Sequence, residues 1–204
     1  HGKGVRALAV PTDVSQRSDV ERLADAALNT FGTFDIWVND AGVGAIGRFT
    51  DIPLEDHEKV IQTNLLGVIY GSYFAMRQFR QQQHGVLINI ASALGKIPAP
   101  YYASYTASKF AVVGLGGSLR QELDQDEIRG VHVSTIMPMA HDTPFFEHAA
   151  NFTGHQAVPI PPTYDPDLTI DTIIEMAIDQ LDLPGIAHSD EDNLRSQRPQ
   201  TLNH

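Results

Sequence analysis

The sequence predicts an α/β fold with an open parallel sheet that helices cover on both faces. Two observations carry this prediction: short apolar runs alternate with longer amphipathic stretches, and most of the runs end in polar or glycine-containing turns. Strands that alternate with helices pair in parallel, because each helix returns the chain across the sheet. We therefore expect one domain over residues 1–181 that is built from repeated strand–helix units.

The first two units occupy the first 83 residues. Val5–Pro11 is a short apolar run that predicts a strand, and apolar residues spaced by three and four after Ser15 predict a helix that ends at Gly32. Phe34–Val38 is the second predicted strand, and a long helical pattern then covers about Leu54–Gln83. Both predicted strands are followed by polar residues, which the fold would place at one edge of the sheet.

Two further strands and two further helices follow. Val86–Ala91 and Val131–Met137 are apolar runs that predict strands. The patterns over about Ala103–Leu123 and Asp167–Leu181 predict helices. These elements continue the strand–helix alternation to the end of the predicted domain.

Two segments break the alternation. His141–Pro166 contains five prolines and no apolar period, which predicts a long surface loop. Residues 182–204 are polar and aperiodic, so we expect an extended tail. The histidines spaced by seven within the loop would need a continuous helix to share a metal, and its proline and glycine residues disfavour one. No metal site is therefore expected.

Composition and charge disfavour several classes of function. The chain has 204 residues and a net charge of −11, so its field repels nucleic acid and anionic lipid surfaces. It contains no cysteine, which excludes disulfides and thiolate metal sites. No apolar run reaches the roughly 20 residues that a membrane span needs. We expect a cytoplasmic enzyme that acts on a small molecule.

The clearest chemical pattern is Tyr105 followed four residues later by Lys109 at the start of a predicted helix. This spacing puts both side chains on one helical face. A nearby ammonium group favours the phenolate, so we expect the pKa of Tyr105 to be lowered toward the range of a useful general acid or base. Ser92 precedes Tyr105 by 13 residues and can bind the same substrate oxygen. The pair alone is weak evidence, because a half-buried tyrosine with a solvated lysine one turn away is common.

Five other short motifs accompany this pair: Thr12-Asp13-Val14, Asn39-Asp40-Ala41-Gly42, Asn64 within Gln62-Thr63-Asn64-Leu65-Leu66-Gly67, Asn89-Ile90-Ala91-Ser92, and Pro138 with Thr143. Together with the pair they resemble the compact, single-domain branch of the short-chain dehydrogenase/reductase family, over about residues 4–181. The resemblance implies a Rossmann-like, doubly wound parallel sheet with three α/β/α layers. It also implies a homodimer or homotetramer.

The resemblance implies an oxidoreductase that transfers a hydride between NAD or NADP and a ketone or secondary alcohol. Tyr105 would be the general acid or base, and Ser92 would orient the substrate. Lys109 would hold the nicotinamide ribose, and Asn64 would anchor a water that connects Lys109 to solvent. These four residues are the predicted catalytic set.

The same resemblance assigns the cofactor contacts. Asp13 would contact the adenine amino group, and the backbone of Asn39, Ala41 and Gly42 would pass close to the adenine ribose. The remaining predicted cofactor contacts are Tyr105, Lys109, Pro138 and Thr143.

Three residues depart from the family pattern. Asp40 stands where a second asparagine is usual, and Ala91 stands where a second serine often precedes the residue that corresponds to Ser92. Met139 replaces the glycine that usually follows the motif proline. We expect Met139 to affect the geometry of its loop without changing the reaction class.

Two parts that the family implies are missing from the sequence. No Gly-rich phosphate-binding turn lies between a strand and its helix, and the motif register places the first residues just before the family's third strand. In the sheet order 3-2-1-4-5-6, the first two strands would lie between Val5–Pro11 and Phe34–Val38, so we expect a gap there. The final strand expected after Leu181 is also missing. We therefore expect the sequence to be an incomplete record of a longer enzyme.

Two alternatives stay open at this point. A non-catalytic binding or scaffold protein on a truncated fold of the same family would explain the missing phosphate site, although the retained catalytic set argues against it. A sugar-nucleotide epimerase would use the same tyrosine and lysine, but such relatives carry a larger substrate domain. Five aromatic residues near the expected site either line an apolar substrate pocket or pack as ordinary loop residues: Tyr101, Tyr102, His141, Phe145 and Phe146.

Overall fold

The computed structural model of the protein describes residues 5–141, 143–159 and 161–181, and it confirms the predicted α/β fold. Three parallel strands form the central sheet in the order β1-β3-β4. These strands are Ile36–Asn39 (β1), Gly85–Ile90 (β3) and Val131–Ile136 (β4). In register, Ile36 lies opposite Val86, and Gly85 lies opposite Val131.

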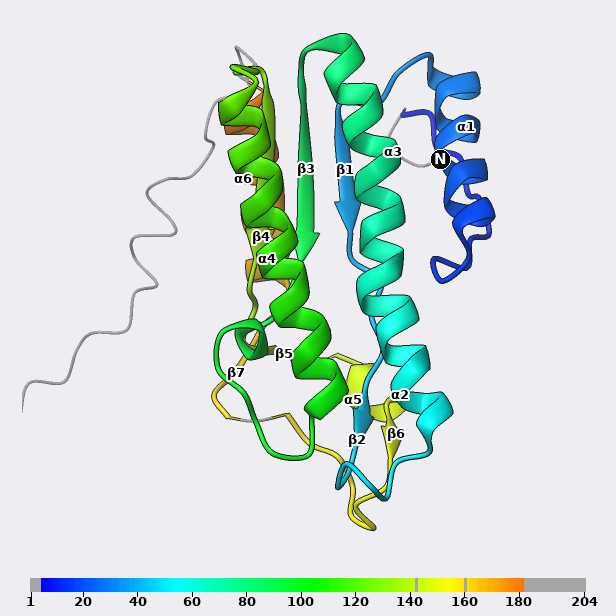
Figure 1. Ribbon diagram of the computed structural model, residues 1–204, viewed down its shortest axis with the longest axis vertical. Helices are drawn as coiled ribbons and strands as arrows, with labels where there is room; N and C mark the ends of the chain where they lie inside the picture. Colours follow the sequence, from blue (N-terminus) through cyan, green and yellow to red (C-terminus); the bar gives the residue numbers. More distant parts are fainter. Residues whose placement is uncertain (1–4, 142, 160, 182–204) are drawn as a thin grey trace, which may run out of the picture.

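Helices cover both faces of this sheet (Figure 1). The long helices α3 and α4 lie on one face and α6 lies on the other, while α1 packs beside α3. The helix bounds are Arg17–Phe31 (α1), Leu54–Ile61 (α2), Gly67–Gln82 (α3), Ala103–Gln125 (α4), Phe145–His148 (α5) and Asp167–Gln180 (α6). Within the described residues, no helix is long and apolar enough to span a bilayer.

The alternation of side chains along β3 explains the three layers. Leu87 points to the cluster that α3 and α4 form with Phe79, whereas Val86 and Ile88 pack against α6 around Ala177. All six residues of β3 are buried, as expected for a strand that has helices on both faces. The sequence predicts this strand well because such a strand is a continuous apolar run.

The predicted helix over Leu54–Gln83 is present but contains a change of winding. A π-helical turn, Gln62–Leu66, joins α2 to α3 without a break. Gly32 ends α1 as predicted: it has a φ of +86°, and its N–H donates to the carbonyl of Leu28. A φ in this region favours glycine, because it has no Cβ that would clash.

The prediction of a strand over Val5–Pro11 is wrong. Among the described residues, no strand pairs with this segment, and Val5 and Leu8 are 68% and 48% exposed. A strand exists through hydrogen bonds to a neighbouring strand, and an apolar run by itself does not supply that neighbour.

The prediction of an aperiodic loop over His141–Pro166 is also incomplete. The segment contains α5, β6 (Ala150–Asn151) and β7 (Thr163–Tyr164), and β5 (Ala140–His141) overlaps its start. β6 pairs with β2 (Ala45–Ile46), and β7 pairs with β5, both in parallel. Two-residue strands are too short to leave a period in the sequence, and their partners lie far along the chain.

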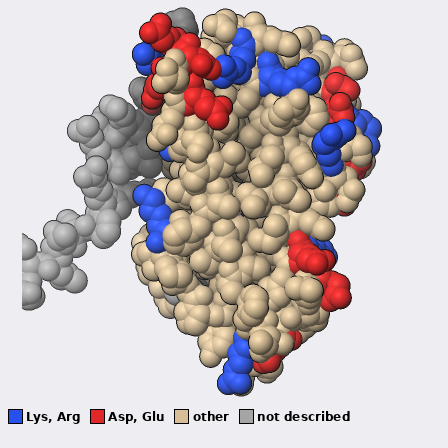
Figure 2. All heavy atoms as spheres, viewed as in Figure 1, with Lys and Arg blue, Asp and Glu red and all other residues tan. Residues whose placement is uncertain are grey.

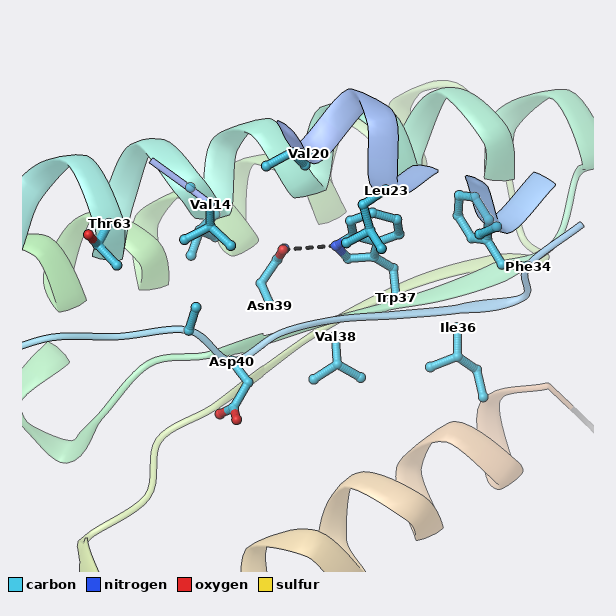
Figure 3. Close-up of a pocket in the computed structure, with 14 residues that line it drawn as sticks. Val14, Val20, Leu23, Phe34, Ile36, Trp37, Val38, Asn39, Asp40 and Thr63 are labelled. Atoms are coloured by element: carbon cyan, nitrogen blue, oxygen red, sulfur yellow. Dashed lines mark hydrogen bonds between the residues drawn. The ribbon is translucent and has the colours of Figure 1, made fainter. Parts of the chain in front are cut away.

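The open edge of β1 faces a groove of about 370 Å³ that is lined mainly by apolar residues (Figure 3). Trp37 and Asn39 point to the side of β1 on which α1 and α3 lie. Ile36, Val38 and Asp40 point to the opposite side, and Ile36 and Val38 are each 40% exposed. The groove therefore lies at the sheet edge where the sequence predicts a gap.

A buried polar network joins β1, β3 and α3. The Trp37 Nε1–H donates to Asn39 Oδ1 at 2.8 Å, and Asn39 Nδ2 donates to Asn89 Oδ1 at 2.8 Å and to Ser72 Oγ at 3.2 Å. Gly71 allows α3 to approach this network, because a Cβ there would overlap Asn39 Oδ1 and lie 2.8 Å from Trp37 Nε1.

We predict that Gly71→Ala lowers the free energy of unfolding by at least about 2 kcal/mol, because the new methyl group has no space and must displace Asn39. Gly114→Ala in α4 is the matched control, because a Cβ there has nothing within 4 Å. It should raise the free energy of unfolding by about 0.5–1 kcal/mol through helix propensity. Urea unfolding of both variants checks this, and equal midpoints would contradict it.

Candidate active site

Tyr105 and Lys109 lie one turn apart in the first turns of α4, on one face as predicted. Lys109 is only 4% exposed, and its Nζ donates to the carbonyl of Ile90 at 2.9 Å. The same Nζ lies 5.6 Å from the centroid of the Tyr105 ring. The hydrogen bond therefore ties the start of α4 to the carboxyl end of β3.

Ser92 follows β3 and lies beside Tyr105. Its backbone is extended, its Oγ accepts from the N–H of Leu94 at 3.1 Å, and its side chain is near enough to Tyr105 to lower the pKa of that tyrosine. Gly95 lets this turn lie against α4, because a Cβ there would be 2.9 Å from the carbonyl oxygen of Lys109. The end of β3 thus presents Ser92 to the tyrosine hydroxyl.

The pKa of Lys109 is lowered to about 8. Burial is the main cause, because it removes water from the ammonium group, and the charge of Asp40 acts in the opposite direction. Asp40 is one of the residues that depart from the family pattern. It therefore helps to keep the buried lysine charged.

The prediction that Lys109 lowers the pKa of Tyr105 is wrong for this structure. Burial raises the pKa of Tyr105 above its ordinary value, the nearby Ser92 side chain lowers it only in part, and Tyr102 raises it further. The physical reason is desolvation of the phenolate, which the sequence alone does not reveal. The hydroxyl of Tyr105 is therefore protonated at neutral pH.

Asn64 is fully buried in the π-helical turn and is satisfied by the protein itself. Its Oδ1 accepts from the N–H of Val43 at 2.8 Å, and its Nδ2 donates to the carbonyl of Val43 at 2.9 Å. The Nδ2 also donates to Ser108 Oγ at 3.3 Å, and Ser108 donates to the carbonyl of Tyr105 at 2.6 Å. This chain of bonds links the segment after β1 to helix α4 at Tyr105.

Ser108 is a site residue that the sequence reasoning did not single out. It is fully buried between Asn64 and the backbone of Tyr105. A small polar residue three positions after the tyrosine on the same helix was the available signal. We regard Ser108 as a positioning residue, because it acts through Asn64 and Tyr105.

The predicted cofactor residues lie in several parts of the structure. Gly42 lies beside the catalytic set, because a Cβ there would be 3.7 Å from both Lys109 Nζ and Asn64 Oδ1. Asn39 and Ala41 line the groove of Figure 3, although the Asn39 side chain is committed to the buried network. Asp13 lies in the turn that precedes α1, where its carboxylate accepts from the N–H and hydroxyl of Ser15.

The last two predicted cofactor residues follow β4: Pro138 lies in the loop between β4 and β5, and Thr143 comes after β5. The carbonyl of Pro138 accepts from the N–H of Ala93 at 2.9 Å, so this loop is fixed beside the turn that carries Ser92. Thr143 lies five residues after Pro138, and its N–H donates to the carbonyl of His141 at 3.0 Å. Met139 is 50% exposed. In the described part of the chain, no three histidine or acidic side chains are grouped as metal ligands would be.

A family model described as short chain dehydrogenase matches residues 1–153. The 3beta-hydroxysteroid dehydrogenase 1 of Eggerthella lenta is 39% identical over 155 residues, which are 76% of this chain and 58% of that protein. The "Uncharacterized oxidoreductase YxnA" of Bacillus subtilis is 37% identical over 155 residues, which are 76% of this chain and 43% of that protein. The chain thus spans about half the length of these curated relatives.

A solved structure shares the fold. The crystal structure of a short chain dehydrogenase/reductase from Burkholderia phymatum in complex with NAD matches with a TM-score of 0.68 and 29% sequence identity. The match covers 86% of this chain and 62% of that one.

We predict that Asn64→Ala lowers the free energy of unfolding by about 2–4 kcal/mol, because it leaves the N–H and carbonyl of Val43 without their partners. Gln121→Ala removes a similar amide from an exposed position of α4 and should change the value by less than about 0.5 kcal/mol. Chemical denaturation measures both, and a loss in Asn64→Ala no larger than in the control would refute the structural role of this amide.

Proposed function

The chain belongs to the short-chain dehydrogenase/reductase family, and we propose from this that it carries the catalytic site of an NAD(P)-dependent oxidoreductase for ketones and secondary alcohols. The observation that supports this proposal most is the placement of Ser92, Tyr105 and the buried Lys109 together at the carboxyl end of β3. Ligands of open α/β sheets bind at this edge.

The donor groups at the site fit a nicotinamide cofactor. Lys109 Nζ carries three N–H donors, is buried, and makes one hydrogen bond to Ile90, so further donors are available to ribose hydroxyls beside Gly42. We propose that Lys109 and Tyr105 hold the nicotinamide ribose and that Pro138 and Thr143 contact the nicotinamide. When bound, the cofactor supplies or accepts the hydride.

The adenosine part of the cofactor has a separate set of proposed contacts. The backbone of Asn39, Ala41 and Gly42 would pass along the adenine ribose, and Asp13 would meet the adenine amino group. Two of these residues line the groove beside β1, which offers an apolar surface of suitable size for a flat base. The relative from Burkholderia phymatum is solved with NAD, which supports NAD as the first nucleotide to test.

Tyr105 is the proposed proton carrier. Because its pKa is raised, its hydroxyl is protonated at neutral pH and can donate a proton to a carbonyl oxygen. In reduction, Tyr105 would protonate the carbonyl oxygen while the carbonyl carbon receives the hydride and its electron pair from the bound cofactor, so that a ketone, a reduced cofactor and a proton would become an alcohol and the oxidised cofactor. Ser92 would hold the same oxygen, and the reverse steps would oxidise the alcohol.

Asn64 is proposed to connect this site to solvent. Its side-chain amide is already committed to Val43 and Ser108, so we propose that the main-chain carbonyl of its π-helical turn holds the connecting water. Protons that leave Tyr105 would be replaced along this path by way of Lys109.

We also propose that the protein forms a homodimer or homotetramer. Figure 2 shows that charged residues on the face of α3 and α4 lie mainly towards its edges. These helices expose three large apolar side chains: Ile69 at 38%, Tyr73 at 57% and Phe110 at 42%. Met76 and Phe79, also on α3, are buried in the core and are not part of this surface. Exposed apolar side chains of this size are typical of a surface that another chain covers.

We predict that Tyr105→Phe lowers kcat for ketone reduction by about 10²- to 10⁴-fold, because the proton donor is lost while the ring and its packing remain. Nucleotide affinity should fall only modestly compared with kcat, because the variant loses one proposed ribose contact while Lys109 keeps its own. The matched control is Tyr102→Phe, which removes the hydroxyl of the neighbouring tyrosine and should retain most of the activity. Consumption of reduced cofactor over a panel of ketones, together with calorimetric titration of NAD and NADP, provides the measurement. Full activity of Tyr105→Phe would overturn the mechanism, and failure of both nucleotides to bind would favour a scaffold.

The pH dependence of reduction should follow Lys109. A lysine is charged below its pKa, so the ammonium group is present at neutral pH and is lost as the pH rises through about 8. We predict that kcat/KM for reduction is constant at neutral pH and falls above about pH 8. Lys109→Arg keeps a positive charge to beyond about pH 12, so any activity that it retains should not show this fall. The same fall in both proteins would contradict this assignment.

A further inference from the structure

Two aromatic side chains flank the Tyr105 ring and come from different parts of the chain. The Phe145 ring of α5 packs against Tyr105 with 5.5 Å between centroids and an interplanar angle of 60°. The Tyr102 ring lies 6.4 Å from Tyr105 in an edge-on arrangement. Phe146 supports Phe145 at 5.3 Å. The proposed proton donor is thus flanked by apolar surface.

The position of Phe145 is set by the segment that follows β1. Ala150 donates its N–H to the carbonyl of Gly44 at 2.9 Å, and Phe152 donates its N–H to the carbonyl of Ile46 at 2.8 Å. These bonds of the β2–β6 pair hold the segment that contains α5 next to residues 44–46. The hydrogen bonds between β2 and β6 therefore fix the position of α5, and with it the position of Phe145.

Gly44 provides the space that the Phe145 ring occupies. A Cβ at Gly44 would lie 2.8 Å from Phe145 Cζ and 3.4 Å from the Cβ of Ala149. Real Cβ atoms do not approach other carbons this closely, so even an alanine at position 44 would move the ring. The placement of Phe145 against Tyr105 thus depends on this glycine.

Phe145 is not a residue of the hydrophobic core. Its side chain is only half buried, and it belongs to none of the four buried clusters among the described residues. Tyr105, by contrast, packs against the cluster of Ala45, Ile52 and Val60. Phe145 therefore keeps some accessible surface, and its ring lies beside the ring of the tyrosine that would meet a substrate.

We propose that Phe145 determines substrate specificity and, with Tyr102, selects ketones and secondary alcohols that carry an apolar ring beside the reacting carbon. This inference rests on the proposed function, because it concerns the substrate of that site. Aromatic edges and faces bind a ring through packing and quadrupole contacts. The Phe145 ring has no hydrogen-bonding group for the hydroxyl of a small polar substrate, which would lose water without gaining a partner there.

The test compares kcat/KM for α-tetralone, an apolar bicyclic ketone, with kcat/KM for hydroxyacetone, a small polar ketone. In Phe145→Ala and in Gly44→Ala, the ratio of the two values should fall about 10-fold or more, because the ring is removed in one variant and displaced in the other. Phe152→Ala removes an exposed phenylalanine from the same segment, and Gly117→Ala adds a methyl group where nothing lies within 4 Å. Both controls should keep the ratio of the unaltered protein.

A second measurement does not require turnover. Saturation-transfer NMR reports whether α-tetralone binds the full chain, and Phe145→Ala should lose that signal while Phe152→Ala keeps it. A reduced ratio or a lost signal in the Phe145 variant supports the inference. An unchanged ratio in an active enzyme, or binding that is the same without the ring, overturns it. If no ketone is reduced but binding of the ring compound depends on Phe145, the proposed function fails and the inference that Phe145 binds an apolar ring stands.

Discussion

The hydrogen bond from the buried Lys109 to the carbonyl of Ile90 is the interaction on which the site depends. A buried ammonium group is costly unless it is paired, so this bond restricts where the start of α4 can lie relative to the end of β3. Tyr105 and Ser92 are brought together because one belongs to that helix and the other follows that strand. Gly95 allows the turn that carries Ser92 to lie close to α4, since a larger residue there would push the turn away from the helix.

Buried amides extend this constraint to the rest of the sheet. Asn64 holds both backbone groups of Val43, and Asn39 holds Asn89 across β1 and β3. Neither contact belongs to a strand ladder, yet each fixes a segment that leads into the site. Because an unpaired buried amide is expensive, such bonds favour one arrangement over other packed arrangements. The polar groups of this core therefore specify geometry, while its apolar groups supply most of the burial.

Sequence reasoning predicts the elements whose signal is local. The buried strand β3 is a continuous apolar run, and the spacing of Tyr105 and Lys109 fixes a shared helical face. It fails where the cause is distant: Val5–Pro11 has no partner strand among the described residues, and β6 becomes a strand only because Ala45 lies opposite Ala150. The predicted pKa of Tyr105 is wrong for a related reason, because burial in the folded chain is its largest cause and is not encoded in the spacing of Tyr105 and Lys109.

The two shifted pKa values give Tyr105 and Lys109 different protonation behaviour near neutral pH. Burial raises the pKa of Tyr105 and lowers that of Lys109 to about 8, because it disfavours the charged form of each group. Tyr105 therefore stays a neutral acid near neutral pH, and Lys109 is the member of the pair whose charge responds to small changes there. The aromatic residues that flank Tyr105 contribute to this burial. The aromatic residues that we propose to select an apolar substrate would thus also keep the proton on the proposed donor, and both effects would follow from the same packing.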